Sequence, residues 1–222
     1  MTSPPESDSG TATRDRDRPA RLLRAEHDAL LPILRRTPEA NFAKPTACPG
    51  WSVRDVLAHC SSALTRTTTG DLHAFTPEQN EKDVAARRSW PLSDVLSELA
   101  AGYLGAGAPL ASAGGRLDGI ALGEWIHGGD VRDALGEPFA YASEGYDDAC
   151  ELLAERTCRR AIPLVEVSFG DRRLVLGAAL PDRPLATLHT DRPTLMRLVS
   201  GRPALPANYE LKGATPDELL VF

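Results

Sequence analysis

The chain has 222 residues, a formal net charge of −6 and a hydrophobic fraction of 42%. At about 100 to 200 residues per domain, this length allows one full domain and a small second one. The ordinary composition excludes a collagenous or wholly disordered chain. The acidic balance, with no run that concentrates Lys and Arg, lacks the electrostatic footprint of a nucleic-acid binder. We therefore expect a globular protein with no nucleic-acid partner.

The distribution of apolar residues and cysteines indicates a cellular compartment. Residues 1–18 contain no apolar segment that would act as a signal peptide or membrane anchor. No later window has the eighteen or so consecutive apolar residues of a spanning helix. The four cysteines form no CxxC pair, so reduced and mostly buried thiols are expected. These features favour a cytoplasmic protein with no membrane partner.

Helical periodicity occupies the first two thirds of the chain. The polar, charge-alternating residues 1–18 are expected to be a disordered tail. From residue 19 to 160, apolar residues recur three and four positions apart, which is the spacing of one helix face. The pattern predicts five helices, which most simply form a bundle: residues 19–36, 52–69, 92–105, 116–135 and 144–160.

Local signals refine these helices. Pro32 lies inside the first one and predicts a kink or an early break, because proline lacks the backbone donor. Ser52 and Asp55 have the spacing of a capping box at the start of the second helix. The small-residue stretch 106–115 is expected to be a loop.

After residue 160 the pattern changes to a small α+β unit. Apolar residues alternate on both sides of Gly170-Asp171, which predicts a β-hairpin with a two-residue turn. Residues 185–190 are a third candidate strand, and Pro193 and Gly201 bracket a short helix over residues 194–200. The fold class is therefore mainly α with a small α+β tail, divided into a tail (1–18), a helical bundle (19–160) and an α+β domain (161–222).

The helix predicted over residues 116–135 carries polar residues in its apolar stripe. Glu124 and His127 lie between apolar residues at steps of three and four, so both face the core. A charge in that position is costly unless it is paired, protonated or bound to a metal. The Glu-x-x-His spacing is also one by which bundle helices present metal ligands inward.

His59 is a candidate third ligand, because the second helix can point it inward beside Val56 and Cys60. Two imidazoles and one carboxylate leave an open position, as catalytic zinc sites do. From the residues alone, an equally simple interpretation is a buried Glu124–His127 pair with a structural His59.

Two further residues have open roles. His27 lies on an apolar face of the first helix, where a single histidine is more often structural. Asp130 lies one turn after His127 and either orients that imidazole or pairs at the surface with Arg54 or Arg132.

Several segments resemble one known family. Residues 49–59, with the sequence PGWSVRDVLAH, resemble the start of the mycothiol-dependent maleylpyruvate isomerase family, part of the DinB-like superfamily of metal-binding helical bundles. Residues 124–136, EWIHGGDVRDALG, resemble the second metal motif of that family. Residues 80–96 are similar to the segment between the two motifs, and residues 195–203 to the family's C-terminal domain, a small unit like the sterol carrier fold.

The resemblance implies a DinB-like four-helix bundle and a divalent metal, usually zinc, held by His59, Glu124 and His127, with a small-molecule thiol, mycothiol, as cosubstrate. It also implies that Arg202 acts in catalysis and cofactor binding by contacting the thiol or an anionic substrate. Arg202 is otherwise interpreted as a surface arginine after a helix cap. The family commonly has Glu four residues before the second His, where this chain has Gly123.

These implications favour an isomerase or S-transferase in which the metal activates the thiol, since the thiolate is the reactive form. The partners would be the thiol and a small electrophile; the electrophile and the oligomeric state stay open. A non-catalytic metal or small-ligand binding protein is the alternative, and a purely structural helical domain is the third hypothesis.

Overall fold

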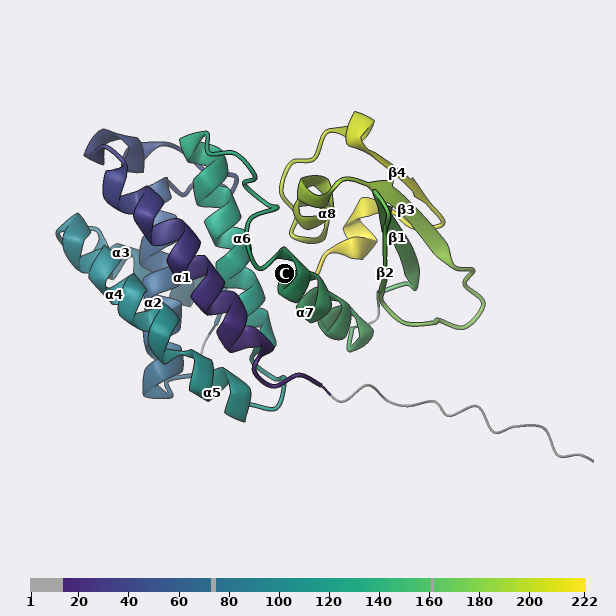
Figure 1. The fold of residues 1–222 in the computed structure, drawn as a ribbon, viewed down its shortest axis with the longest axis horizontal. Coiled ribbons are helices and arrows are strands. Elements are labelled where there is room, and N and C mark those ends of the chain that lie inside the picture. Colours follow the sequence, from purple (N-terminus) through teal and green to yellow (C-terminus); the bar gives the residue numbers. More distant parts are fainter. Residues whose placement is uncertain (1–13, 73–74, 161) are drawn as a thin grey trace, which may run out of the picture.

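The computed structural model describes residues 14–72, 75–160 and 162–222. The fold is mainly helical, with a small sheet near the C-terminal end, as predicted (Figure 1). The helices of the first part are, in chain order, α1 (Arg18–Arg36), α2 (Val53–Thr69), α3 (Pro77–Arg87), α4 (Leu92–Gly105), α5 (Gly107–Ser112), α6 (Asp118–Leu135) and α7 (Tyr146–Cys158). A short 3-10 turn, Glu39–Ala43, follows α1.

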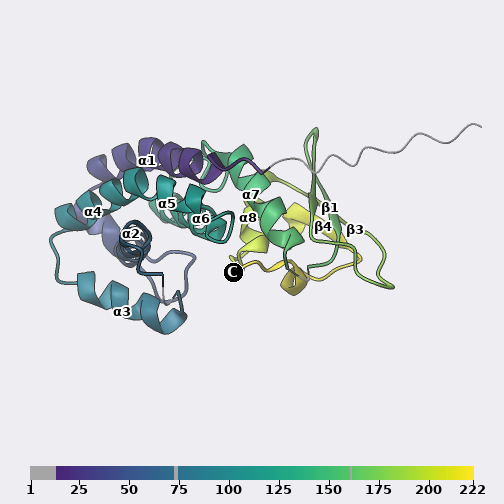
Figure 2. The same ribbon diagram turned by 90° about the horizontal axis from the view of Figure 1, so that it is seen from below.

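Four of these helices form the bundle. Helix α1 packs on α4 and α6, and α2 packs on the same two helices from the other side. Their apolar faces make one continuous core, in which Leu22, Leu57, Leu99 and Trp125 are at most 1% exposed. Helix α3 lies outside the bundle beside α2, as Figure 2 shows from below.

The start of α2 is set by its local sequence. The Ser52 hydroxyl accepts a hydrogen bond from the Asp55 backbone, and the Asp55 carboxylate accepts one from the Ser52 backbone. This confirms the predicted capping box, which satisfies backbone donors that a helix start leaves unpaired. It also fixes the rotation of α2 and hence the direction of His59, two turns later.

The C-terminal unit consists of a four-stranded sheet and one α-helix of eight residues. Its elements are β1 (Val165–Phe169), β2 (Arg172–Leu176), β3 (Ala186–Thr190), α8 (Arg192–Val199) and β4 (Tyr209–Lys212). The strand order is β2-β1-β3-β4, with β1 and β3 parallel and the outer pairs antiparallel. The register Phe169↔Arg172 confirms the hairpin turn at Gly170-Asp171, where Gly170 has a φ of 59°.

Helix α7 joins the two parts, because it packs on α1 and α6 and also on β2. Its Tyr146 ring contacts Trp125 of the bundle and Phe169 of the sheet, with centroids 5.9 Å apart in both cases. The last residues, Leu219 to Phe222, return between the bundle and the sheet domain, where Figure 1 marks the C-terminus. The seam between the two parts is therefore packed.

Several expectations about local structure need correction. Helix α1 continues through Pro32 to Arg36 without a break, because the exposed Pro32 lies on the solvent side of the helix. The stretch expected to be a loop contains α5. Helix α3 and strand β4 lack the apolar periodicity that would predict them: α3 buries only Val84, and β4 buries no residue fully.

Of the expected disordered tail, residues 1–13 lie outside the described part of the chain. Arg14, which falls within the range of the expected tail, donates hydrogen bonds to Asp118 of α6 at 3.1 and 2.5 Å. Within the residues that the structure describes, no helix has the length and apolar content of a membrane span.

Candidate functional site

Two histidines meet where α2 packs on α6. His59 of α2 and His127 of α6 have ring centroids 5.0 Å apart, in an edge-to-face arrangement. The Trp51 ring, just before α2, lies 5.0 Å from the His59 ring. The predicted inward direction of both imidazoles therefore agrees with their position between the two helices.

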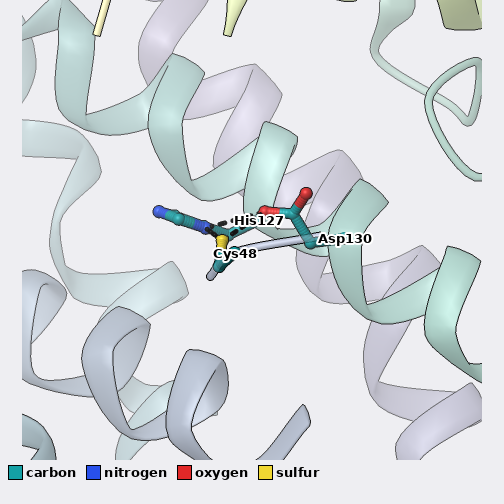
Figure 3. A group of neighbouring side chains, drawn as sticks. All are labelled: Cys48, His127 and Asp130. Carbon is teal, nitrogen blue, oxygen red and sulfur yellow. Dashed lines mark hydrogen bonds and ion pairs between the residues drawn. The ribbon is translucent and has the colours of Figure 1, made fainter. Parts of the chain in front are cut away.

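The His127 imidazole is oriented by Asp130, one turn later on α6. Nδ1 of His127 lies 3.0 Å from Oδ2 of Asp130, whose side chain is fully buried. An ionised carboxylate only accepts hydrogen bonds, so Nδ1 of His127 carries a proton and donates to Asp130, and Nε2 is the ring nitrogen outside this bond. Figure 3 shows the other ring nitrogen directed away from Asp130 and Cys48. Asp130 thus has the orienting role that is typical beside a metal-binding histidine.

The arginine that pairs with Asp130 is Arg202, from the loop after α8. Its Nε and Nη2 donate to the two carboxylate oxygens at 3.0 and 2.7 Å. The expected alternatives are wrong: Arg132 pairs with Glu26, and Arg54 donates to backbone carbonyls. The sheet domain therefore completes this part of the site.

Cys48, which was not among the predicted site residues, joins the same cluster. Its thiol donates to Asp130 at 3.0 Å and lies 3.6 Å from His127 Nδ1, as drawn in Figure 3. Burial and the Asp130 charge raise the pKa of Cys48 to about 12. The residue is thus a neutral thiol and a weak nucleophile at neutral pH. The other cysteines are unpaired too; Cys60 and Cys150 are buried and Cys158 is exposed.

The charge state of Asp130 is set by its partners. Burial alone would raise the pKa of the carboxyl, but hydrogen bonds and charges from His127 and Arg202 outweigh it and hold the pKa well below its usual range. The Tyr141 hydroxyl adds a further hydrogen bond at 2.7 Å. Asp130 is consequently an ionised, fully partnered anion.

His59 and Glu124 have polar atoms with no partner. His59 Nδ1 and Glu124 Oε2 are both buried and accept or donate no hydrogen bond within the described structure. Buried polar atoms without partners are rare in native proteins and call for an explanation, such as an ion. Burial, with added repulsion from His127 and Arg202, lowers the pKa of His59 to about 3. His59 is therefore a neutral imidazole, the form that binds metals.

Glu124 lies deeper than the two histidines. Its side chain is 2% exposed and lies beside the Cys60 thiol. Burial raises the pKa of Glu124 well above its usual range, so this carboxyl lacks a cation that would stabilise its charge. Gly123 occupies the more open position: a Cβ there would meet only the Phe222 ring, at 3.6 Å.

A second set of donor atoms is more compact. Among the described residues, the donors that lie within 4.8 Å of one another and could hold a metal ion are those of Cys48, His127 and Asp130, and not the predicted set of His59, Glu124 and His127. However, Nη2 of Arg202 lies 3.2 Å from Cys48 Sγ, 3.4 Å from His127 Nδ1 and 2.7 Å from Asp130 Oδ2. A cation already contacts all three donors, so a metal would have to displace Arg202. Within the described residues, no arginine or lysine forms a hydrogen bond or ion pair with His127 Nε2, His59 or Glu124.

Two cavities meet at the histidine pair. The first, called here the Trp51 cavity, has a volume of about 660 Å³ and is lined by Trp51, Cys48, Glu78, Glu81 and Arg202. The second, called the triple-arginine cavity, has a volume of about 510 Å³ and is lined by Arg116, Arg156, Arg160, Glu124 and Phe222. His59 and His127 line both. A molecule in either cavity would thus have access to both imidazoles.

His27 lies away from this site. Its ring contacts Tyr103 with a centroid distance of 6.5 Å, and its Nδ1 lies 2.7 Å from Asp28. This placement agrees with the structural interpretation of His27.

The fold and the site define a class: a helical bundle with a histidine pair at the seam with a small α+β domain. Residues 23–117 match the family described as the mycothiol maleylpyruvate isomerase N-terminal domain. The resemblance inferred from the motifs is thereby confirmed. The matched segment contains His59 and ends before Glu124 and His127.

Solved structures extend the likeness to the second domain. The chain is similar to crystal structures of the mycothiol-dependent maleylpyruvate isomerase and of its variant with one histidine replaced by alanine. The TM-scores are 0.55 and 0.54, at 14% sequence identity, over 91% of this chain and 95% of the other. At this identity the likeness shows a shared fold. No curated protein sequence matches the chain.

Proposed function

We propose that the protein is a metal-dependent enzyme that uses mycothiol or a similar small thiol to isomerise an unsaturated acid. The observation that carries this proposal is the pair of unpartnered buried atoms, His59 Nδ1 and Glu124 Oε2, in the cavity that also reaches His127. The match of residues 23–117 to the isomerase N-terminal domain family supports the choice of a thiol.

The donor types suit a divalent metal. Two imidazoles and one carboxylate suit zinc and leave a coordination position open. The ligands would be His59, His127 and Glu124. The chemistry that such a metal supplies is deprotonation of a thiol, which is otherwise mostly protonated at neutral pH.

The side chains have distinct tasks in this mechanism. Asp130 holds the Nδ1 proton of His127 and so keeps Nε2 directed away from the Arg202 pair. Arg202 closes one end of the site and presents positive charge to the Trp51 cavity. Fixed charges of this kind stabilise negative charge that develops during a reaction.

Isomerisation by a thiol needs no net change in atoms. The thiolate sulfur adds to one carbon of the double bond, and the electron pair moves onto the conjugated carbonyl. The former double bond then rotates as a single bond. The electron pair returns, the carbon–sulfur bond breaks, and the thiolate leaves with the double bond restored in the other geometry. If a proton traps the adduct instead, the product is a thioether, as in an S-transferase.

Metal content tests the ligand set. We expect about one equivalent of zinc or another divalent metal per chain, measured by plasma mass spectrometry on protein purified without chelator. His59→Ala should lose most of it, because one of three ligands is gone. Cys48→Ala is the matched control, since Cys48 belongs only to the compact donor group. Two results would refute the proposed ligands. One is loss of the metal from Cys48→Ala while His59→Ala retains it, and the other is a parent protein that holds no metal after incubation with zinc.

Activity tests the reaction. The loaded protein should convert maleylpyruvate only when mycothiol is present, and a chelator should abolish this. Metal binding without any thiol-dependent turnover would instead identify a metal-binding protein, the alternative hypothesis.

Two variants address Glu124 separately. Glu124→Gln keeps the shape and removes the charge, so metal affinity should fall by about tenfold or more. Adding Gly123→Glu should recover part of it, because position 123 faces the open cavity on the His127 side. Unchanged affinity in Glu124→Gln would remove this residue from the ligand set.

A further inference from the structure

The two cavities that meet at the histidine pair differ in charge. In the Trp51 cavity, the one arginine or lysine among the described lining residues is Arg202, which pairs with Asp130. Glu78 and Glu81 also line this cavity, so its net charge is less positive than that of the triple-arginine cavity. The triple-arginine cavity has three guanidinium groups and one acidic side chain, Glu124. Its charge is strongly positive.

The three guanidinium groups are not neutralised by the protein. Across residues 14–72, 75–160 and 162–222, no carboxylate lies within 4.0 Å ion-pair distance of Arg116, Arg156 or Arg160. Asp118 lines an adjoining hollow with these arginines, but it is held by Arg14 at 2.5 Å and by Arg159 at 3.8 Å. Uncompensated charges gathered in one concave place favour a bound anion.

Arg156 is fixed in the wall of the cavity. Its Nε and Nη2 donate to the Val221 carbonyl at 3.2 and 3.1 Å, and its guanidinium stacks 5.0 Å from the Phe222 ring centre. The remaining nitrogen, Nη1, lies against Gly119 of α6, where a Cβ would come within 2.2 Å of it. Burial, together with the positive charges of Arg160 and Arg159, lowers the pKa of Arg156. Arg116 and Arg160 are exposed and flank this fixed group.

The rest of the lining suits a carbon skeleton. Phe75, Ile120 and Phe222 contribute apolar surface, and His59 and His127 lie in the same cavity. A short unsaturated molecule could therefore place an anionic end at the arginines and its double bond at the imidazoles. Guanidinium groups bind carboxylates through paired, charge-assisted hydrogen bonds.

We propose that Arg116, Arg156 and Arg160 form a carboxylate-binding subsite that selects anionic electrophiles and orients them toward the histidine pair, while the thiol enters through the Trp51 cavity. This inference rests on the proposed function for the identity of the reaction. The subsite itself depends only on the arginines and is testable without turnover. Arg116, Arg156 and Arg160 determine specificity and touch the end of the substrate that does not react.

The probe is maleate, a small unsaturated dicarboxylate, titrated calorimetrically into the full-length protein at low ionic strength. The key variant is Arg116→Gln/Arg160→Gln, which removes two exposed charges and leaves the packed Arg156 in place. Maleate affinity should fall at least about tenfold, because hydrogen bonds to charged groups are worth more than neutral ones. Arg173→Gln is the matched control: this arginine is 78% exposed on β2 and pairs with Glu166.

Each outcome decides the proposal. Loss of affinity in the double variant, with no loss in Arg173→Gln and no binding of dimethyl maleate, supports a carboxylate subsite. Equal maleate affinity of the parent and the double variant would overturn the proposal. Equal losses of maleate affinity in the double variant and in Arg173→Gln would also overturn it, because they would indicate a long-range electrostatic effect of the net charge rather than a local site. Tighter binding of inorganic phosphate than of maleate would overturn the carboxylate assignment.

His59→Ala separates this proposal from the metal site. Maleate affinity that survives in His59→Ala supports the arginine subsite even if the protein holds no metal. Affinity that disappears in His59→Ala and persists in the arginine variant would place the anion at the histidines and refute the subsite.

Discussion

Helix α6 takes part in two buried carboxylate–guanidinium pairs that are chemically alike and differ in their surroundings. Arg132 donates to both oxygens of Glu26 on α1, at 2.8 and 3.0 Å. Arg202 donates to both oxygens of Asp130, at 3.0 and 2.7 Å. In each pair the guanidinium and the carboxylate meet through two parallel hydrogen bonds, the geometry that arginine favours.

The two ion pairs differ in the other residues that they contact, and this difference indicates a different role for each. Glu26 and Arg132 are 0% and 2% exposed and join two bundle helices. Gly128 makes room for them, since a Cβ there would clash with Glu26. The Asp130 pair also binds His127, Tyr141 and Cys48, and its arginine borders a cavity. The comparison teaches that a buried ion pair indicates function when its members also orient a reactive group, and packing when they bind only each other.

Breaking the bundle pair should have the largest effect on stability. Arg132→Met leaves Glu26 as a buried carboxyl without a partner, which typically costs about 3 to 5 kcal/mol. Urea unfolding followed by circular dichroism measures this loss. Glu26→Gln/Arg132→Met should recover part of it, because no charge is then left unpaired. Equal stability of the single variant and the parent would show that this pair does not hold α1 to α6.

Breaking the site pair should affect stability less and function more. In Arg202→Met, Asp130 keeps its bonds from His127 and Tyr141, so the expected loss is about 1 to 3 kcal/mol. Thiol-dependent turnover should fall about 100-fold or more, the usual effect of removing a stabilising charge from an active site. Arg183→Met is the control, since Arg183 pairs with Glu218 at the surface of the same domain. If both variants keep full activity, Arg202 has a structural role alone.

Much of this arrangement could be predicted from the sequence. The apolar stripes and the Ser52 cap predict α1, α2, α4, α6 and α7 closely, because periodicity reports the buried face of a helix. The same stripes direct His59 and His127 inward, and Asp130 follows His127 by one turn. Local spacing is therefore enough to place these two imidazoles and Asp130 where α2 meets α6.

The other half depends on contacts distant in the sequence. Arg202 and Cys48 are 154 residues apart and meet only when the sheet domain packs on the bundle. Neither residue lies in a periodic segment that would indicate which way its side chain points. Arg132 was a candidate partner for Asp130, but two residues on a helix are about 200° apart, so its side chain reaches Glu26 on the opposite face. The partners of Asp130 and Glu26 are therefore determined by tertiary packing and not by sequence spacing.

A pH measurement sharpens the comparison further, with the smallest expected effect. The folded pKa of His59 is about 3, and the unfolded value is about 6.5. Between these values the unfolded chain binds a proton that the folded chain does not, so stability falls as pH falls. Metal-free protein should lose about 1 to 2 kcal/mol of unfolding free energy between pH 7 and pH 5 through this group. The His59→Gln variant should not show this loss.

The arginine variants extend the pH comparison. The charge of Arg202 contributes to the lowered pKa of His59, so Arg202→Met should reduce the loss of stability between pH 7 and pH 5, while Arg183→Met should leave it unchanged. Urea midpoints at the two pH values give both comparisons, and a pH dependence identical in the parent and His59→Gln would contradict the buried, neutral imidazole.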